Sequence, residues 1–164
     1  MKVKFKGNEV NLLGKEVKTG DNAPDFKVVS NDLKDITLKD TKGIRILLSV
    51  PSIDTPVCDI EVKEFNKRAS DLKNTTIYTI SMDLPFAQAR WCAANDIERV
   101  HTASDYKYRD FGEKYGVYAE ELGLLARAAF VLDSNNKVIY SEYCSEITNQ
   151  PDFDSIIEAA EKAQ

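Results

Sequence analysis

The sequence predicts an α/β fold, a sandwich in which helices flank a central mixed β-sheet, with an added N-terminal β-hairpin. The apolar run Ile44–Val50 is short and lies between Gly43 and Pro51, as is typical of a buried strand. Apolar residues recur at helical spacing directly after this run and again near the C-terminus. The order strand, helix, strand, helix, strand pair, helix favours layered α/β packing.

The sequence pattern of the N-terminal third of the chain predicts β-strands and extended segments. Apolar and polar residues alternate on both sides of the turn pair Gly7-Asn8, which indicates a β-hairpin. Two short extended segments follow at Phe26–Val29 and Ile36–Leu38, before the buried strand Ile44–Val50.

The middle of the chain predicts two helices and a second buried strand. After the turn Pro51–Val57, a helical stripe is formed by Val62, Phe65, Ala69 and Leu72. Thr76–Ile80 is the next strand, and a crossover places it beside Ile44–Val50. The second helix is capped by Asp83, and we expect its inner face to carry Phe86, Ala89 and Ala93.

The last third begins with a weakly patterned stretch, Ile97–Tyr118, which includes a short helix near Tyr106–Glu113. A strand pair is predicted at Ala128–Leu132 and Lys137–Tyr143. A final helix has an apolar stripe formed by Phe153, Ile156, Ile157 and Ala160.

Size and charge narrow the function classes. A chain of 164 residues fits one domain, residues 1–164. The net charge of −5 argues against a nucleic acid or an anionic membrane surface as main partner. No apolar run approaches the about 20 residues that span a bilayer. The first residues are basic but lead into no apolar core, so we expect no signal peptide and a cytoplasmic protein.

Three cysteines, Cys58, Cys92 and Cys144, are present, and none belongs to a Cys-x-x-Cys unit. In a reducing compartment a stable disulfide scaffold is not expected, so these thiols are either buried and inert or reactive. Cys58 lies where the loop after the buried strand enters a helix. Free backbone N–H groups and the helix dipole stabilise a thiolate there, and the thiolate is the nucleophilic form.

The loop Pro51–Cys58 contains the pattern Pro-x-x-x-Thr-x-x-Cys. In this pattern the sequence resembles the peroxiredoxins. The longer string Pro-Ser-x-Asp-Thr-x-Val-Cys-Asp is similar to their bacterial thiol peroxidase branch. Further segments match that branch in the same order along the chain: Asp83–Ala87, Arg90–Cys92, Phe111–Val117 and Leu124–Asp133.

The resemblance implies a thioredoxin-like fold and a role for each loop residue. Cys58 would attack the peroxide, Thr55 would offer its hydroxyl to the sulfur or the peroxide, and Pro51 would shape the loop and shield the sulfur. Arg127 would supply a permanent cation beside the thiolate. Without the resemblance, the loop prolines and Thr55 are equally explained as turn residues.

Arg127 also has support from the residues alone. It is the only charged residue in an apolar segment, where a charge needs a partner or a function. Strand alternation could instead turn it to solvent. Arg45 lies in a similar run and is interpreted as structural.

Cys92 lies on the second predicted helix, where the resemblance implies a resolving cysteine that forms an intramolecular disulfide with Cys58. Two cysteines on separate helices seldom satisfy disulfide geometry, so we expect a helix end to unwind. An inert core residue beside Trp91 is the alternative. Cys144, at the end of a predicted strand, is interpreted as a packing residue.

We expect no cofactor and no metal. A zinc site from His101 and the cysteines lacks any ligand-pair spacing, and nothing places His101 as the base of a cysteine hydrolase. The sequence thus predicts a thiol peroxidase that reduces hydrogen peroxide and organic hydroperoxides and is recycled by a thioredoxin-like reductant. The resemblance also implies a homodimer. A general dithiol–disulfide oxidoreductase and a redox-sensing module are the alternatives.

Overall fold

The computed structural model describes all residues from Met1 to Gln164. Its centre is a seven-stranded mixed sheet with the order β11-β10-β5-β6-β7-β3-β4. These strands are β3 (Lys27–Ser30), β4 (Asp35–Thr37), β5 (Ile44–Ser49), β6 (Thr75–Ser81), β7 (Val100–Ser104), β10 (Ala128–Leu132) and β11 (Val138–Tyr143).

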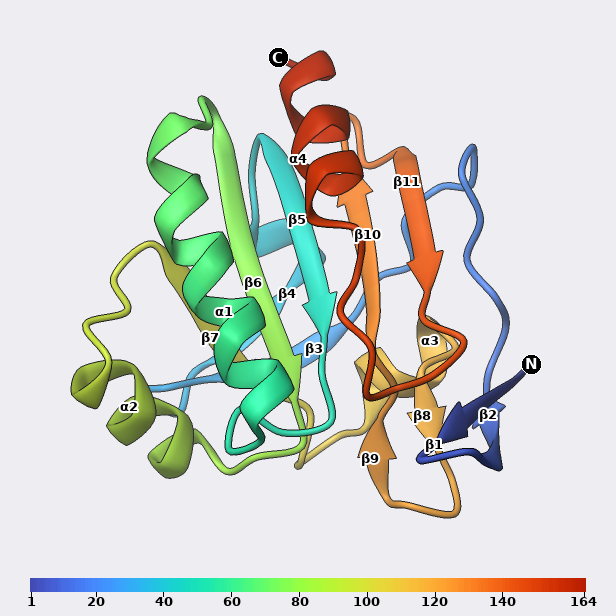
Figure 1. Ribbon diagram of the computed structural model, residues 1–164. Helices are drawn as coiled ribbons and strands as arrows, with labels where there is room; N and C mark the ends of the chain where they lie inside the picture. The colour runs from blue at the N-terminus through green and yellow to red at the C-terminus, as the bar shows by residue number, and fades with distance from the viewer.

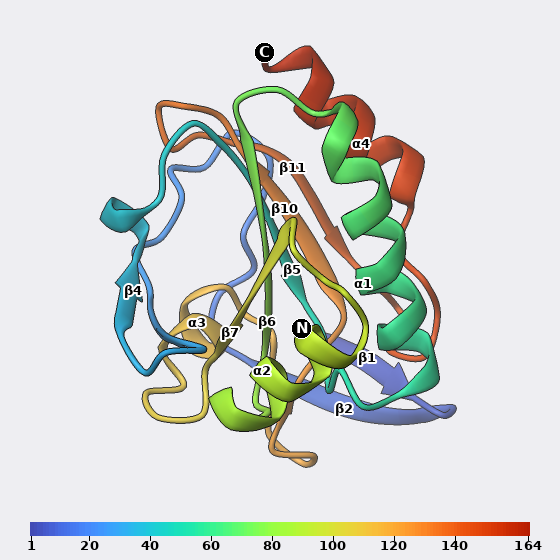
Figure 2. The ribbon, with the colours of Figure 1, turned by 90° about the vertical axis from the view of Figure 1, so that its left-hand side faces the viewer.

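Helices lie on both faces of this sheet (Figures 1 and 2). They are α1 (Pro56–Arg68), α2 (Pro85–Ala94), α3 (Asp110–Lys114) and α4 (Phe153–Lys162), with short 3-10 turns at Leu38–Asp40 and Ala69–Asp71. α1 and α4 cover one face, α3 lies on the other, and α2 packs on β7. The predicted α/β sandwich with a central mixed sheet is therefore confirmed. None of the helices has the length and apolar character needed to cross a membrane.

β5 is an interior strand of the sheet, and all six of its residues are buried. It pairs parallel with β6 and antiparallel with β10, so no edge of it is exposed. Its side chains alternate between two cores: Leu47 packs with Phe111 and Phe130, whereas Ile46 and Leu48 pack under α1 and α4. The loop that precedes Cys58 begins at the end of this buried strand.

A second, four-stranded sheet contains the predicted N-terminal hairpin. It has the order β1-β2-β8-β9, formed by β1 (Lys2–Phe5), β2 (Asn8–Leu13), β8 (Tyr118–Ala119) and β9 (Leu124–Leu125). Its apolar side chains pack against Ala126 and Ile147. This small core contains Ala126, the residue directly before Arg127, so it fixes the backbone at the entry to β10.

Three details differ from the sequence predictions. β7 forms in the weakly patterned stretch, where no strand was expected. The inner face of α2 is formed by Pro85 and Gln88, whereas the side chain of Phe86 is 67% exposed. Gln88 is buried because its Nε2 donates to Ser81 Oγ and to the carbonyl of Ala103. Leu84, not Asp83, is the N-cap of α2.

Candidate active site

Cys58 lies in the first turn of α1, at the carboxyl end of β5. Thr55 is the N-cap: its backbone is extended and its Oγ1 accepts a hydrogen bond from the Cys58 N–H at 3.3 Å. Pro56 occupies the first helical position, where its missing N–H costs nothing. The Cys58 side chain is fully buried. The sequence thus folds locally into a capped helix start that holds a sulfur in the interior.

The Asp83 carboxylate ties the loop before Cys58 to the end of β6. It accepts hydrogen bonds from Ser52 Oγ at 2.7 Å, the Ile53 N–H at 2.9 Å and Ser81 Oγ at 2.6 Å. A residue expected to cap α2 therefore organises the active-site loop instead. The contacts satisfy loop groups that would otherwise be left without partners next to a buried site.

Arg127 is buried and reaches the sulfur of Cys58, with 3.0 Å between Nη2 and Sγ. Its Nη1 donates to Glu61 Oε1 at 2.7 Å, and its Nε donates to the Ile147 carbonyl at 2.7 Å. The alternative in which strand alternation turns Arg127 to solvent is wrong. Three differently placed acceptors orient the planar guanidinium, so its positive charge is fixed beside the sulfur.

Glu61 is a member of this group that the sequence predictions missed. It lies one turn after Cys58 on α1 and is fully buried, and its Oε2 has no hydrogen-bond partner. Burial raises the pKa of Glu61 to about 7, against the lowering effect of Arg127. A signal was available, because Glu61 is a carboxylate on the same helical stripe as Val62 and Phe65.

The two remaining loop residues occupy distinct positions. Pro51 is buried and lies two residues after the end of β5. The Thr55 hydroxyl donates to the Ser52 carbonyl at 3.1 Å while it caps the helix. Its proton is thus directed at the backbone, and contact with a bound peroxide would require the hydroxyl to rotate.

Cys92 lies on α2, and its thiol is not bonded to Cys58. Its Sγ is 3.4 Å from Thr102 Oγ1 on β7, and that hydroxyl donates to Asn31 Oδ1 at 2.9 Å. With the hydroxyl proton used on Asn31, the Cys92 thiol is the donor in its own contact. The structure therefore holds the side chain of Cys92 against β7.

Cys144 also lies beside Arg127, although the two residues are distant in sequence. Its environment differs from that of Cys58. Its N–H donates to the Arg127 carbonyl at 3.0 Å, directly after β11. Burial and the neighbouring Glu142 carboxylate raise the pKa of Cys144 to about 12. A thiol in these surroundings stays protonated, which agrees with a packing residue.

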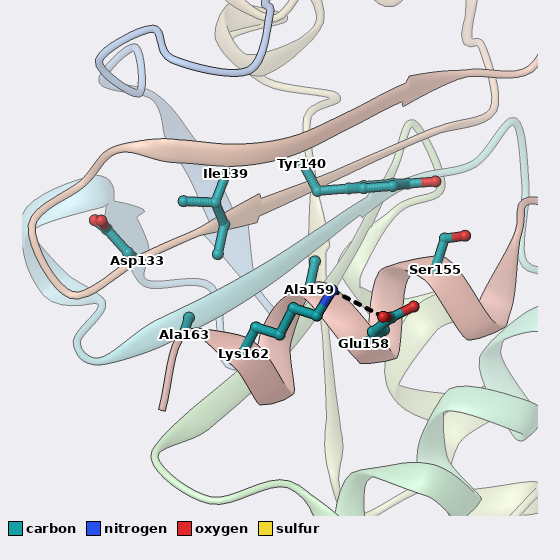
Figure 3. Close-up of a pocket in the computed structure, with 8 residues that line it drawn as sticks. All are labelled: Asp133, Ile139, Tyr140, Ser155, Glu158, Ala159, Lys162 and Ala163. Atoms are coloured by element: carbon teal, nitrogen blue, oxygen red, sulfur yellow. Dashed lines mark ion pairs between the residues drawn. The ribbon is translucent and has the colours of Figure 1, made fainter.

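A further groove lies away from Cys58. It has a volume of about 520 Å³, lies between β11 and α4, and contains the ion pair Glu158–Lys162 (Figure 3). It is lined by no cysteine. Two smaller hollows of about 250 Å³ and 240 Å³ adjoin the loop at Ile53 and the thiol of Cys92. No three His, Cys, Asp or Glu side chains gather as a metal site would require.

The chain is similar to known proteins over nearly its whole length. Residues 18–157 match the Redoxin family. A thiol peroxidase of Clostridium acetobutylicum is 56% identical over the full length of both chains, and one of Bacillus subtilis is 55% identical, with 96% of this chain and 95% of the relative covered. The crystal structure of a peroxiredoxin-like protein from Aquifex aeolicus superposes with a TM-score of 0.94 at 41% identity, covering 99% of this chain and 97% of the other.

These likenesses confirm the thioredoxin-like peroxiredoxin fold and, with the buried cysteine at a helix start, the type of enzyme. The chain belongs to the redoxin family and, within it, to the peroxiredoxin-type thiol peroxidases.

Proposed function

We propose that Cys58 reduces hydrogen peroxide and organic hydroperoxides, that Cys92 then forms a disulfide with it, and that a thioredoxin-like dithiol protein restores both thiols. The single observation that carries this proposal is the 3.0 Å contact between Arg127 Nη2 and Cys58 Sγ in a water-excluded site. A fixed cation at that distance stabilises a thiolate and the charge that moves through it during attack.

In the first step the Cys58 thiolate attacks one peroxide oxygen. An S–O bond forms, the O–O bond breaks, and the leaving oxygen takes up a proton to become water or an alcohol. Cys58 becomes a sulfenic acid, oxidised by two electrons. The sulfur must be deprotonated, and the peroxide must lie in line with it, so the ordered helix start and loop contribute chiefly by positioning.

Arg127 and Glu61 together set the charge at the sulfur. One guanidinium faces two acids, the Cys58 thiol and the Glu61 carboxyl, so ionisation of one disfavours ionisation of the other. Below pH 7 the Glu61 carboxyl takes up a proton, which leaves the full charge of Arg127 to the thiolate. Glu61 is therefore a positioning residue, because it holds the guanidinium that contacts the sulfur.

In the second step Cys92 attacks the sulfenic sulfur. An S–S bond forms between Cys58 and Cys92 and water leaves. The reductant returns two electrons by thiol–disulfide exchange, attacking this bond with one thiolate and closing its own disulfide. The three free thiols of the chain are consistent with work in a reducing compartment, and we place it in the cytoplasm.

We also propose a homodimer. Two large exposed apolar side chains, Leu84 and Phe86, flank the start of α2. The exposed Tyr106 lies nearby, because Ser104 Oγ accepts from the Tyr106 N–H and donates to the carbonyl of Asp83. A cluster of exposed apolar residues at the carboxyl ends of the strands is typical of a protein interface.

Turnover of cysteine variants tests the proposed chemistry. We expect Cys58→Ser to consume no hydroperoxide with thioredoxin, thioredoxin reductase and NADPH present. Cys92→Ser should react once and stall as a sulfenic acid that overoxidises, because the resolving thiol is gone. Cys144→Ser, the matched control, should turn over at close to the wild-type rate. Mass spectrometry of oxidised wild type should find the Cys58–Cys92 linkage.

Substantial turnover by Cys58→Ser would overturn the assignment of the nucleophile. A Cys58–Cys144 bond, or a bond only between two chains, would show that the resolving cysteine is wrongly assigned. Oxidation without repeated turnover would point to the redox-sensing alternative.

Arg127→Gln should slow oxidation of Cys58 on the order of 100-fold, because a fixed charge at the reacting atoms is lost. The pH profile of thiol alkylation should move to higher pH by at least about 1 unit. Arg127→Lys keeps the charge but loses the planar contacts, so its alkylation profile should lie between those of wild type and Arg127→Gln. An unchanged profile and an unchanged oxidation rate in Arg127→Gln would assign Arg127 to structure alone.

Glu61→Gln should change how stability depends on pH. The pKa of Glu61 rises from 4.5 in the unfolded chain to about 7 in the folded one, so the folded protein binds this proton more tightly. Its stabilising contribution is complete below pH 4.5 and is lost as pH rises to 7. The free energy of unfolding of Glu61→Gln, measured by urea denaturation, should therefore increase relative to wild type across this range. A constant difference between pH 4.5 and 7 would contradict the raised pKa.

Phe86→Asp should convert the dimer into monomers, because it places a charge in the apolar cluster at the start of α2. Multi-angle light scattering measures the mass directly. Leu33→Asp is the matched control, since Leu33 is similarly exposed but lies in the turn between β3 and β4. If both variants keep the wild-type mass, the interface lies elsewhere.

A further inference from the structure

One hydrogen bond joins the helix of Cys58 to the helix of Cys92. Trp91 Nε1 on α2 donates to Asp59 Oδ1 on α1 at 3.1 Å. Asp59 directly follows Cys58, and Trp91 directly precedes Cys92. No other hydrogen bond connects these two helices, so the link is formed by the immediate neighbours of the two sulfurs.

Trp91 also fills the space between the helices. Its partly buried ring packs against the small cluster formed by Val50, Ile53 and Cys58, and against the larger core under α1. The indole therefore touches the surroundings of Cys58 on one side while its N–H holds Asp59 on the other. Both contacts favour an α2 that lies folded against the Cys58 site.

Elsewhere α2 is attached through few residues, chiefly Gln88, whose Nε2 donates to Ser81 Oγ and to the Ala103 carbonyl. Only Pro85 and Gln88 are buried along its length, and the Gln88 Oε1 is buried without a partner. An unsatisfied buried acceptor costs free energy that is recovered when it meets water. The contact with Trp91 therefore makes a large contribution to keeping this helix in place.

The position of Cys92 requires α2 to move. Its sulfur contacts Thr102 on β7, and no bond to Cys58 is present. A disulfide needs its two Cα atoms within about 7 Å and accurately directed Cβ atoms. We expect Cys92 to reach Cys58 by movement of α2 away from β7, which would break the Trp91–Asp59 hydrogen bond.

We propose that the Asp59–Trp91 hydrogen bond is a latch that holds α2 closed and limits the rate at which Cys92 resolves oxidised Cys58. The inference rests on the proposed Cys58–Cys92 chemistry. While the latch is closed, the sulfenic acid of Cys58 persists and can react with a second hydroperoxide molecule, which oxidises it to sulfinic acid as its own O–O bond breaks. The latch thus sets how oxidised Cys58 divides between disulfide and overoxidised product. Asp59 and Trp91 are positioning residues.

Asp59 variants isolate the hydrogen bond from the charge. Asp59→Ala removes the acceptor, whereas Asp59→Asn keeps an oxygen that can accept from Trp91. Asp59 also pairs with Lys63 at 2.9 Å, so Lys63→Met removes the ion pair and leaves the latch in place. Wild type and the three variants are oxidised with increasing hydroperoxide, and the disulfide and sulfinic forms are quantified by mass spectrometry. Trp91, the only tryptophan of the chain, reports the opening of α2 by stopped-flow fluorescence.

Asp59→Ala should accelerate both the fluorescence phase and disulfide formation roughly fivefold, as expected for loss of one partly exposed hydrogen bond to a carboxylate. The hydroperoxide concentration that overoxidises half of the protein should rise by the same factor. Asp59→Asn and Lys63→Met should stay within about twofold of wild type. In a Trp91→Phe background, which lacks the donor, Asp59→Ala should have no further effect on product division.

An Asp59→Asn protein that behaves like Asp59→Ala would overturn the latch, because the charge and not the hydrogen bond would then be responsible. The same conclusion follows if Asp59→Ala leaves the rates of the fluorescence phase and of disulfide formation unchanged. It also follows if Asp59→Ala still changes the ratio of disulfide to sulfinic product in the Trp91→Phe background. Failure of the underlying chemistry is distinguishable: wild-type protein would then form no Cys58–Cys92 bond at any hydroperoxide concentration.

Discussion

The buried guanidinium of Arg127 is the group on which the site depends. From its place directly before β10, it bonds to two parts of the chain that are distant in sequence. These are Cys58 and Glu61 on α1 and the backbone carbonyl of Ile147 after β11. Charge in the interior is tolerated only when it is paired and hydrogen-bonded, so these parts must come together for any of them to be stable. The same requirement that stabilises the fold therefore assembles the reactive centre.

The surroundings of Cys58 and Cys144 show how the fold selects one thiol. Both are buried and both lie near Arg127. Cys58 receives the guanidinium at a helix start, whereas Cys144 follows a strand and faces the Glu142 carboxylate, which with burial raises its pKa to about 12. Because burial strengthens every electrostatic interaction, one cation and two carboxylates give the two thiols different electrostatic surroundings, which supports the roles proposed for Cys58 as nucleophile and Cys144 as packing residue.

Features that depend on local pattern were predictable from the sequence. The buried run of β5, the helical stripe of α1 and the entry of Cys58 into that helix are encoded by neighbouring residues. β7 was missed because its pattern is short and its burial comes from β6 and β3 on either side. The prediction for the inner face of α2 was wrong, because the polar residue Gln88 finds hydrogen-bond partners on two strands. Such partners arise only from tertiary structure, and the same holds for the contacts of Glu61.

The proposed chemistry places two opposing demands on the site, and different elements are suited to each of them. Attack on a peroxide requires a fixed sulfur, and the loop before Cys58 is held by Asp83 and the Thr55 cap. Disulfide formation requires displacement, and α2 has few buried contacts and an unsatisfied Gln88 carbonyl. Segments with few buried contacts open at the lowest free energy. Motion should therefore come first from the helix of Cys92, which leaves the peroxide-binding side of the site intact until the sulfur has reacted.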